Sequence, residues 1–326
     1  MAKLTMVKAL NLALAEAMRA DANVMVIGQD VAQDDGVFRV TEHLLAEFGP
    51  DRCIDTPLAE GGLVGAAVGL CCVGFRPIVE IQFDGFAYEA LHLIENHVRR
   101  MRNRTRGRQT CPLVIRIPYG GGIRAIEHHS ESPEATFAHL PGLHVVIPSG
   151  PRNARALLRE AIFSPDPVIF LEPKAVYRSV REEVPDAPET LPFGHGQIVR
   201  PGHDVTLIAF GAMLRPALEA ADILAGEHTI EAEVVDLLSV APLDAALLHE
   251  SVSRTGRAVV IHEAPRHCGV GAEIVARIVE NSLLQLEAPV KRVTGFDTVI
   301  PYFANEKTYL PDAGRVVQAA LETVQF

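Results

Sequence analysis

Cysteine is scarce in this sequence, and its few cysteines form no recognisable motif. The chain of 326 residues contains five of them, an odd number, and no two are spaced as a CxxC pair. This argues against a disulfide framework and against a cysteine zinc site, and it favours a protein of the reducing cytosol. Cys71 and Cys72 lie in an apolar run, where we expect reduced, buried thiols.

The sequence also lacks an excess of positive charge and any long apolar run. Its 30 Lys and Arg residues against 41 Asp and Glu give a formal net charge of −11, which argues against nucleic acid or an anionic membrane as the main partner. The longest weakly charged run, 61–75, is too short to span a bilayer. At the N-terminus, acidic Glu16 and an amphipathic pattern stand in place of a signal peptide.

One basic stretch, Arg99 to Arg108, stands out against the acidic background because six of its ten residues are arginine. Its simplest interpretation is the solvated end of a helix followed by a loop. Docking of an acidic partner is the alternative.

Short apolar segments alternate with helical periodicity along the chain. The segments expected to be buried strands span residues 24–28, 77–81, 113–117, 144–148, 168–172, 205–211, 232–238 and 258–263. Their near-continuous apolar character is typical of strands covered by helices on both faces. The alternation predicts an α/β protein with two domains, each a doubly wound parallel sheet.

Helices are expected between these strands, and a break in the pattern divides the chain. The first helix covers Met6 to Met18 with Thr5 as its cap, and further helices are predicted over 213–225 and 270–286. A charged, proline-rich stretch without periodicity sets the expected boundaries. They are residues 1–180 for the first domain, 181–202 for a linker and 203–326 for the second domain.

Several common ligand-binding motifs are missing. No GxxxxGK[ST] phosphate loop, GxSxG elbow, HExxH pair or EF-hand loop occurs. The nearest dinucleotide fingerprint, Gly269-Val270-Gly271, lacks a third glycine at the required offset. We interpret it as plain accommodation of the backbone at a helix start.

Glu60 is the first candidate for chemistry, in a segment where small residues and proline run into a helix. Taken alone, a glutamate in the first helical turn only complements the positive end of the helix dipole. The glycines at 61, 65 and 69 share one helical stripe. That stripe permits a very close helix contact, either in the core or at an oligomer interface.

Two further segments, one rich in glycine and histidine and one rich in aromatic residues, follow the ends of predicted strands. Three glycines at 120–122 precede the adjacent histidines His128 and His129, at the sheet edge where α/β proteins bind ligands. Neighbouring histidines point in different directions, which disfavours a shared metal, while a solvated loop and a proton-handling histidine both stay open. The aromatic segment 80–88 is either ordinary core packing or a flat face for a planar ring.

Taken together and in this order, these segments resemble the β subunits of the decarboxylating component of pyruvate and branched-chain 2-oxo acid dehydrogenases. The stretches that carry the resemblance are DTPLAEGGLVGAAVG, EIQFDGF, PYGGGIRAIEHHSESPEA, PGLHVVIP, FLEPKAVYR and KRVTGFDTVIPYF. The resemblance implies a transketolase-like fold. A domain that binds the pyrimidine of thiamine diphosphate would be followed by a transketolase C-terminal domain.

The resemblance also implies roles for single residues. Glu60 would hydrogen-bond the aminopyrimidine ring of the cofactor and favour its imino tautomer. Phe86 would lie against that ring, and Gln82 would contact the cofactor beside it. His129 would transfer a proton while the acyl group passes to a lipoyl group, with His128 as its neighbour.

Some members of the family hold a structural potassium ion. The matching positions here are Leu113, Ala161, Ser164 and Asp166. Ser164 and Asp166 depart from the family's pattern, which has an acidic and an amide ligand at these places.

The family's magnesium and diphosphate loop belongs to a separate α subunit, and this sequence has no such loop. The resemblance therefore implies an α2β2 heterotetramer in the cytoplasm, acting on a small 2-oxo acid and docking on a lipoyl acyltransferase core. Two alternatives stay open at this point. One is the β subunit of an acetoin dehydrogenase, and the other is a non-catalytic, flavodoxin-like binding or scaffold protein.

Overall fold

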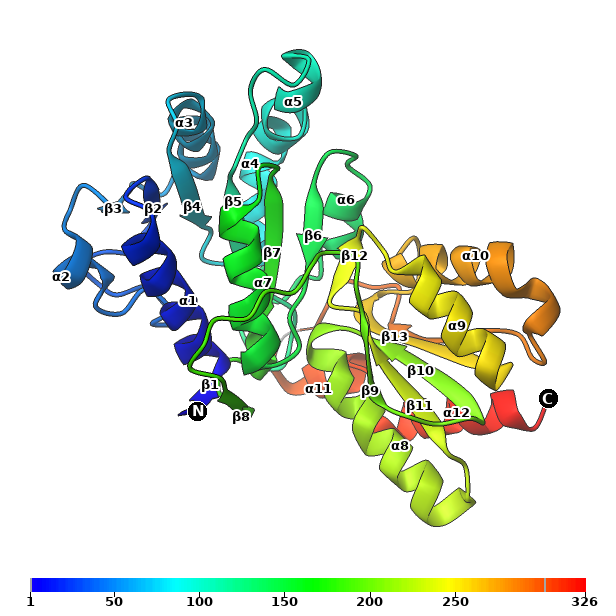
Figure 1. The fold of residues 1–326 in the computed structure, drawn as a ribbon. Coiled ribbons are helices and arrows are strands. Elements are labelled where there is room, and N and C mark those ends of the chain that lie inside the picture. The colour runs from blue at the N-terminus through cyan, green and yellow to red at the C-terminus, as the bar shows by residue number, and fades with distance from the viewer. Residues whose placement is uncertain (1, 302) are drawn as a thin grey trace.

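The computed structural model describes residues 2–301 and 303–326. These residues form two domains that lie side by side, each a sheet covered by helices on both faces (Figure 1). The expected fold class, an α/β protein with two mostly parallel sheets, is confirmed. Within the described residues, no helix is long and apolar enough to cross a membrane.

Within this described part, the first domain is built on a seven-stranded sheet in which only the edge strand β12 runs antiparallel to its neighbour. In order across the sheet its strands are β12 (Ser239–Ala241), β6 (His144–Val146), β7 (Val168–Pro173), β5 (Val114–Tyr119), β4 (Arg76–Glu80), β2 (Val24–Gly28) and β3 (Cys53–Asp55). Every residue of β2, β5 and β7 is buried. Complete burial is what the unbroken apolar sequence of these segments predicts.

Helices cover both faces of this sheet. They are α1 (Met6–Ala20), α2 (Leu44–Phe48), α3 (Glu60–Cys72), η1 (Asp84–Phe86), α4 (Ala87–Leu93), η2 (Ile94–Val98), α5 (Met101–Arg104), α6 (Glu134–Ala138), α7 (Pro151–Phe163) and η3 (Lys174–Val176). Side chains alternate along β2, so that Val24 and Val26 pack with α1 and α7, whereas Met25 and Ile27 pack with α3 and α4. The period of two therefore places successive residues in two separate cores.

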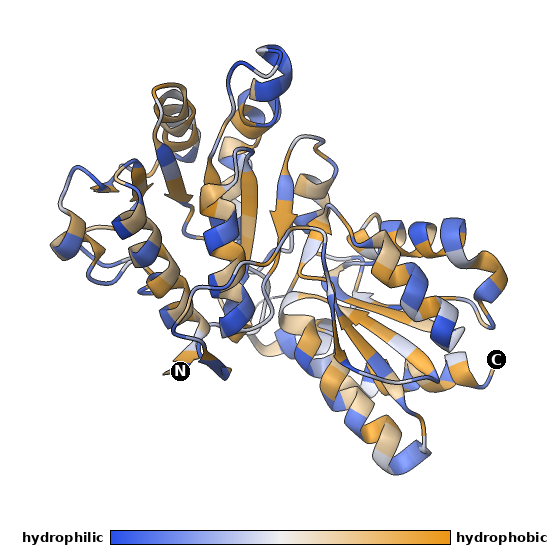
Figure 2. Ribbon diagram, in the orientation of Figure 1, coloured by the Kyte–Doolittle hydropathy of each residue, from blue (hydrophilic) through white to orange (hydrophobic). Residues whose placement is uncertain are grey.

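The second domain repeats this plan with a five-stranded sheet. Its order is β14 (Lys291–Gly295), β13 (Ala258–Pro265), β10 (Val205–Ala209), β11 (Ala232–Asp236) and the antiparallel edge strand β9 (Gln197–Arg200). The helices are η4 (Gly211–Met213), α8 (Leu214–His228), α9 (Ala245–Thr255), α10 (Val270–Ser282), η5 (Leu283–Gln285), η6 (Phe303–Asn305), α11 (Glu306–Tyr309) and α12 (Ala313–Val324). Figure 2 shows the strands of both sheets mostly hydrophobic and most covering helices divided into two faces, as amphipathic elements around a core require.

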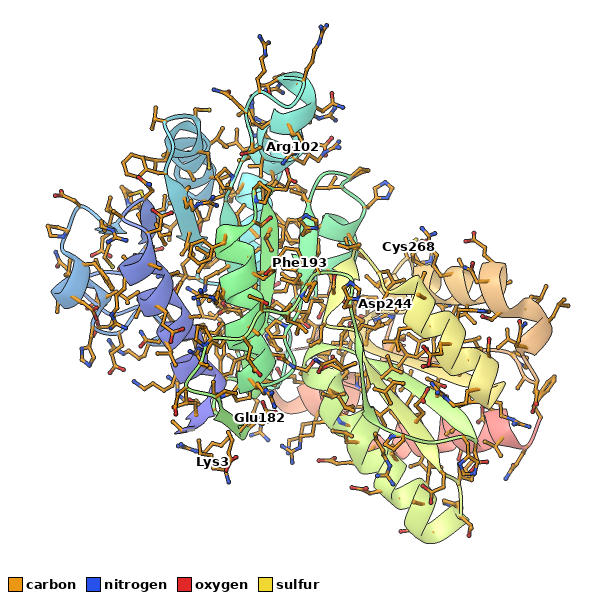
Figure 3. The ribbon with its side chains drawn as sticks, in the orientation of Figure 1. Lys3, Arg102, Glu182, Phe193, Asp244 and Cys268 are labelled. Carbon is orange, nitrogen blue, oxygen red and sulfur yellow. The ribbon has the colours of Figure 1, made fainter. Side chains whose placement is uncertain are left out.

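The two domains interlock instead of meeting at one simple boundary. Strand β12 follows β11 of the second domain but pairs with β6 at the edge of the first sheet. The segment 181–202, expected as a linker, contains β8 (Arg181–Val184), which pairs with β1 (Ala2–Thr5), and the whole of β9. Between these strands Phe193 packs on His144 of β6, with ring centroids 5.0 Å apart (Figure 3). The interdomain segment is thus fixed to both sheets.

The start of α1 shows how short sequence signals place these elements. Thr5 ends β1 with extended backbone and caps the helix, because its side-chain oxygen accepts a hydrogen bond from the backbone N–H of Lys8. The cap expected from the sequence is confirmed. It fixes the N-terminal strand against β8, where Lys3 and Glu182 are labelled in Figure 3.

A buried ion cluster lies at the centre of the first sheet. Arg116 of β5 is completely buried and donates two hydrogen bonds to Glu172 of β7, at 2.7 and 2.9 Å, and a third to Glu80 of β4. Tyr177 donates its hydroxyl hydrogen to the same carboxylate of Glu172. A fork-shaped guanidinium between two carboxylates satisfies three charges that would be costly to bury singly.

Candidate active site

The candidate residues come together at the carboxyl edge of the first sheet. Glu60 follows β3, Gln82 follows β4, and Gly120 follows β5. These strands lie close together in the sheet and run in the same direction, so their carboxyl ends open onto one edge. Such an edge is where open α/β sheets bind ligands.

Glu60 is the first residue of α3 and is 8% exposed. It lies in a small hollow that it shares with Gln29, Ile81 and Gln82. Among the residues that the structure describes, none forms a hydrogen bond or ion pair with its carboxylate. The positive end of α3 favours a negative charge here, and no described residue donates to the carboxylate, so the site suits a ligand that brings a hydrogen-bond donor.

Gln82 forms one wall of this hollow. Its amide nitrogen donates hydrogen bonds to the carboxylate of Asp30, at 2.8 Å, and to the backbone oxygen of Gln29, at 3.4 Å. Both acceptors lie on the segment after β2. The side chain is consequently fixed beside Glu60 by the neighbouring strand.

An aromatic cluster begins at Phe83, the residue that follows Gln82. The rings of Phe83 and His129 are 4.2 Å apart between centroids, and those of Phe86 and His129 are 5.3 Å apart. The predicted residues Phe86 and His129 are therefore neighbours although 43 positions separate them in the sequence. Phe86 is half-buried, which leaves part of a flat ring open to a planar ligand.

His129 is oriented by the neighbouring rings of Phe83 and Phe86 and by one hydrogen bond. Its Nδ1 lies 2.9 Å from the backbone oxygen of Glu127. A hydrogen on Nδ1 donated to that oxygen leaves Nε2 as the basic nitrogen of a neutral imidazole. His128 is exposed and has a left-handed backbone with φ 68°. Its ring, like that of His129, lies beside Phe86, with centroids 6.0 Å apart.

A buried ion pair lies next to the segment that carries His128 and His129. This pair was not identified from the sequence. The Nζ of Lys174 lies 3.3 Å from the carboxylate of Asp84, and both side chains are fully buried. Burial raises the pKa of Asp84 to about 6 and lowers that of Lys174. Both residues sit within the quoted stretches EIQFDGF and FLEPKAVYR. A charge just after a buried strand was the signal that could have found them.

Glu134 is a second buried carboxyl that the sequence did not single out. It is completely buried in the first turn of α6, and no other described residue hydrogen-bonds either of its oxygens. Burial raises its pKa from the usual 4.5 to about 8. Between pH 4.5 and about 8, Glu134 therefore carries a proton in the folded protein but not in the unfolded chain.

Glu134 should make the protein less stable as the pH rises from 5 to 9. Its contribution is fully present below pH 4.5 and is lost as the pH passes through about 8, because the unfolded chain gives up the proton first. Glu134→Gln keeps the shape of the neutral carboxyl and cannot titrate. We expect its melting temperature, followed by far-UV circular dichroism, to fall less over this range than that of the unmodified protein. Glu219 is exposed and forms an ion pair with Arg215. The control variant Glu219→Gln should leave the dependence of the melting temperature on pH unchanged.

The four positions matched to a potassium site lie together, but their oxygens are already used. The carboxylate of Asp166 accepts two hydrogen bonds from Arg102, at 2.6 and 3.0 Å. The hydroxyl of Ser164 bonds the backbone of Asp166, and the carbonyl oxygens of Leu113 and Ala161 accept backbone N–H groups. Arg102 projects from α5 (Figure 3). Each of these oxygens already has a partner in the chain, and potassium binding at the four positions stays a prediction.

Most of the basic stretch is also engaged within the chain. Arg99 and Arg100 pair with Glu95, and Arg102 pairs with Asp166. Pairs of this kind at a helix end agree with the simpler interpretation of the stretch. The docking alternative stays a prediction.

The glycines at 269 and 271 surround a buried histidine. A Cβ atom on Gly269 would lie 2.7 Å from the His262 ring, and one on Gly271 would lie 2.6 Å from it. His262 is completely buried, and burial lowers its pKa to about 4. The GxG sequence is thus accounted for by the close approach of α10 to this ring.

Comparison with known proteins agrees with this geometry. Residues 2–180 match the family model described as transketolase, pyrimidine binding domain, and residues 194–316 match the one described as transketolase, C-terminal domain. The chain also resembles a solved structure titled split gene transketolase, inactive beta4 tetramer. The TM-score is 0.82 with 27% sequence identity, and the match covers 99% of each chain.

Two curated relatives are closer in sequence. The chain is 50% identical over 314 residues to the 3-methyl-2-oxobutanoate dehydrogenase subunit beta of Mycobacterium tuberculosis, which covers 96% of this chain and 90% of that protein. It is 45% identical over 326 residues to the pyruvate dehydrogenase E1 component subunit beta of Staphylococcus aureus, which covers all of both chains. The chain therefore belongs to the β subunits of 2-oxo acid dehydrogenases, a thiamine-diphosphate-dependent family with the transketolase fold.

Proposed function

We propose that this chain and a separate α subunit form the decarboxylating component of a 2-oxo acid dehydrogenase. The pair would oxidatively decarboxylate pyruvate or a branched-chain 2-oxo acid and pass the acyl group to lipoyl-lysine of an acyltransferase core. The observation that carries the proposal is Glu60, a largely buried residue whose carboxylate has no partner in the described chain, at the start of a helix and in a hollow that it shares with Gln82.

The residues around Glu60 suit the aminopyrimidine ring of thiamine diphosphate. The Glu60 carboxylate would accept a hydrogen from a ring nitrogen, which supplies the donor that the site lacks. The flat face of Phe86 and the fixed amide of Gln82 would hold the ring in place. When bound, the cofactor supplies the nucleophilic carbon and the electron-accepting ring that decarboxylation needs.

His129 would serve the later transfer of the acyl group. In that transfer a carbon–sulfur bond would form to one lipoyl sulfur as the disulfide bond breaks, and the other sulfur would take up a proton. The bond that held the acyl carbon would then break as its hydroxyl group loses a proton. The ring is half-buried beside Phe83 and an imidazole can carry this proton near neutral pH. His128 is exposed at the mouth of the loop and would lie toward the incoming lipoyl group.

The need for an α subunit follows from the size and surface of the site. The hollow at Glu60 encloses only about 10 Å³, whereas cofactor pockets usually measure about 300–1,000 Å³. The sequence offers no phosphate loop, so the diphosphate and its magnesium would be held mainly by the α subunit. A second chain would complete the pocket, in an α2β2 assembly.

Helix α3 provides a suitable contact surface for that second chain. Figure 2 shows it with little hydrophilic colour, and Gly62, Gly65, Ala66 and Gly69 are nevertheless exposed. The neighbouring side chains of Leu58 and Val73 are 65% and 72% exposed. A helix that is apolar on every side is normally covered. The five free cysteines fit the cytoplasmic location that is part of this proposal.

Reconstitution with an α subunit tests the proposal directly. We expect carbon dioxide release from pyruvate or from 3-methyl-2-oxobutanoate only when both chains and thiamine diphosphate are present. These substrates differ by a few methyl groups, so a preference of about 10–200-fold per group is expected. Turnover of acetoin alone would identify an acetoin dehydrogenase subunit, and a complex that binds no cofactor would support a scaffold.

A further inference from the structure

The loop that carries the two histidines has no regular secondary structure. It leaves β5 at Gly120 and closes on itself, because the backbone N–H of Gly120 donates to the carbonyl oxygen of Glu131 at 2.9 Å. We call residues 120–131 the histidine loop. Its backbone N–H groups cannot be satisfied by a strand or a helix, so they need other acceptors.

Side-chain carboxylates from the second domain provide these acceptors. Gly121 donates its N–H to Glu263 of β13 at 2.8 Å. Gly122 and Arg124 donate to the two oxygens of Glu306, the first residue of α11, at 3.0 and 3.1 Å. Both carboxylates are almost completely buried, with 5% and 2% exposure. Hydrogen bonds to a charged acceptor are stronger than neutral ones. Burial raises the pKa of Glu263 to about 7, so its bond to Gly121 is charge-assisted only above that pH.

The glycines make this clamp possible. A Cβ atom on Gly120 would lie 2.8 Å from the carboxylate of Glu263, and one on Gly122 would lie 2.7 Å from the side chain of Ala175. Gly120 and Gly122 also have left-handed backbones, with φ of 78° and 94°, which glycine adopts without strain. The three consecutive glycines therefore let the loop lie against carboxylates of the other domain.

The histidines depend on the backbone of this loop for their position. Apart from its aromatic neighbours, His129 has one hydrogen bond in the described chain, with the backbone of Glu127, which belongs to the same loop. His128 rests directly on Gly85, where an added Cβ would lie 2.3 Å from its carbonyl oxygen. A shift of the loop therefore moves the imidazole of His129.

We propose that Glu306 and Glu263 are positioning residues, through which the C-terminal domain holds the histidine loop and sets the place of His129. The inference rests on the acyl-transfer role proposed for His129. It gives the second domain a part in the reaction although its carboxylates touch only the loop backbone. The expected consequence is selective, because Glu60 belongs to a different segment and does not rest on this loop.

Glu306→Gln in the reconstituted α2β2 enzyme tests the clamp. An amide keeps one acceptor oxygen but presents NH2 where the other N–H pointed, so one loop contact is lost. We expect acylation of a recombinant lipoyl domain to fall at least about tenfold. Decarboxylation measured with ferricyanide as acceptor should stay within about twofold, because it does not need the loop histidine. Glu263 accepts only one N–H of the loop, a bond that the oxygen of a glutamine could keep. Glu263→Ala is therefore the second variant and should show the same split.

Two controls make the result decisive. Glu322→Gln removes an exposed carboxylate of the same domain, 48% exposed and paired with Lys291, and should change neither reaction. Hydrogen–deuterium exchange of the peptide covering residues 120–131 should be faster in Glu306→Gln than in Glu322→Gln. Combining Glu306→Gln with His129→Ala should give no further loss beyond that of His129→Ala.

Different experimental outcomes would contradict the role of His129 and the clamp by Glu306 and Glu263. If His129→Ala acylates the lipoyl domain normally, the role of His129 is wrong and this inference falls with it. If His129→Ala is impaired while Glu306→Gln and Glu263→Ala acylate normally with unchanged exchange, the clamp alone is overturned. Equal loss of both half-reactions in Glu306→Gln and Glu263→Ala, with a lowered melting temperature, would also overturn it, because a merely structural role predicts that pattern.

Discussion

Glu60→Gln should lower carbon dioxide release by the reconstituted α2β2 enzyme by at least about 10²-fold, which is the lower bound for losing a positioned proton-transfer group. Glutamine has nearly the shape of glutamate, but its amide cannot take up and return a proton. In the proposed site this proton is shared between the Glu60 carboxylate and a nitrogen of the bound pyrimidine. The measurement is kcat with saturating substrate and cofactor, in the variant and in the unmodified enzyme.

The fold should tolerate this change. Glu60 has no partner among the described residues, and its interaction with the end of α3 is worth about 0.3–1 kcal/mol. Circular dichroism should therefore show a melting temperature within a few degrees of the original. Weaker binding of thiamine diphosphate, measured by calorimetry, should accompany the loss of turnover and does not depend on catalysis.

Glu89 is the matched control for Glu60. It also lies in the first turn of a helix, α4, but it is exposed. Glu89→Gln should leave both turnover and cofactor binding unchanged. Normal turnover of Glu60→Gln would refute the assignment of Glu60, and it would return the residue to the plain helix-dipole interpretation.

The strands covered on both faces were the most predictable part of the fold. The predicted strand 24–28 is identical to β2. The segment 77–81 is shifted by one residue from β4, and the segment 168–172 is one residue shorter than β7. Burial on both faces forces an unbroken apolar run, which can be recognised without any knowledge of the partners. The cap at Thr5 was predictable for a similar reason, because it acts over three residues.

The interlocking of the domains could not be predicted. Strand β9 is mostly exposed and β12 is three residues long, so neither has the apolar pattern that marks a buried strand. Their pairing partners, β11 and β6, are far away in the sequence or in the other domain. Pairing of this kind is decided by tertiary contacts, which outweigh local preference.

The site shows the same division between local and distant information. The motifs placed Glu60, Phe86 and His129, and the structure brings the last two together. The carboxylates of Glu263 and Glu306 were missed because 142 and 184 residues separate them from the glycines that they bind. A buried glutamate in an apolar strand such as 258–263 was the available signal, but its partner could not be named.

Arg116→Met should cost the fold about 3–5 kcal/mol, the usual loss when one member of a buried ion cluster is removed. Methionine fills a similar volume but leaves Glu80 and Glu172 facing each other without a cation in the middle of the sheet. Burial already raises the pKa of Glu80, and the charge of Arg116 opposes that rise. Without Arg116 the two carboxyls should hold protons in the folded state, so the deficit should be larger at pH 8 than at pH 5.

Urea unfolding followed by far-UV circular dichroism measures this loss, since the chain contains no tryptophan to report it. Arg215→Met is the control, because Arg215 is 67% exposed in its pair with Glu219 and such pairs contribute about 0–1 kcal/mol. The triple variant Arg116→Met, Glu80→Gln, Glu172→Gln should regain much of the lost stability, since it removes the uncompensated charges together. A single variant as stable as the control would show that water reaches the cluster, and that its charges are not held in the low-dielectric interior that the structure describes.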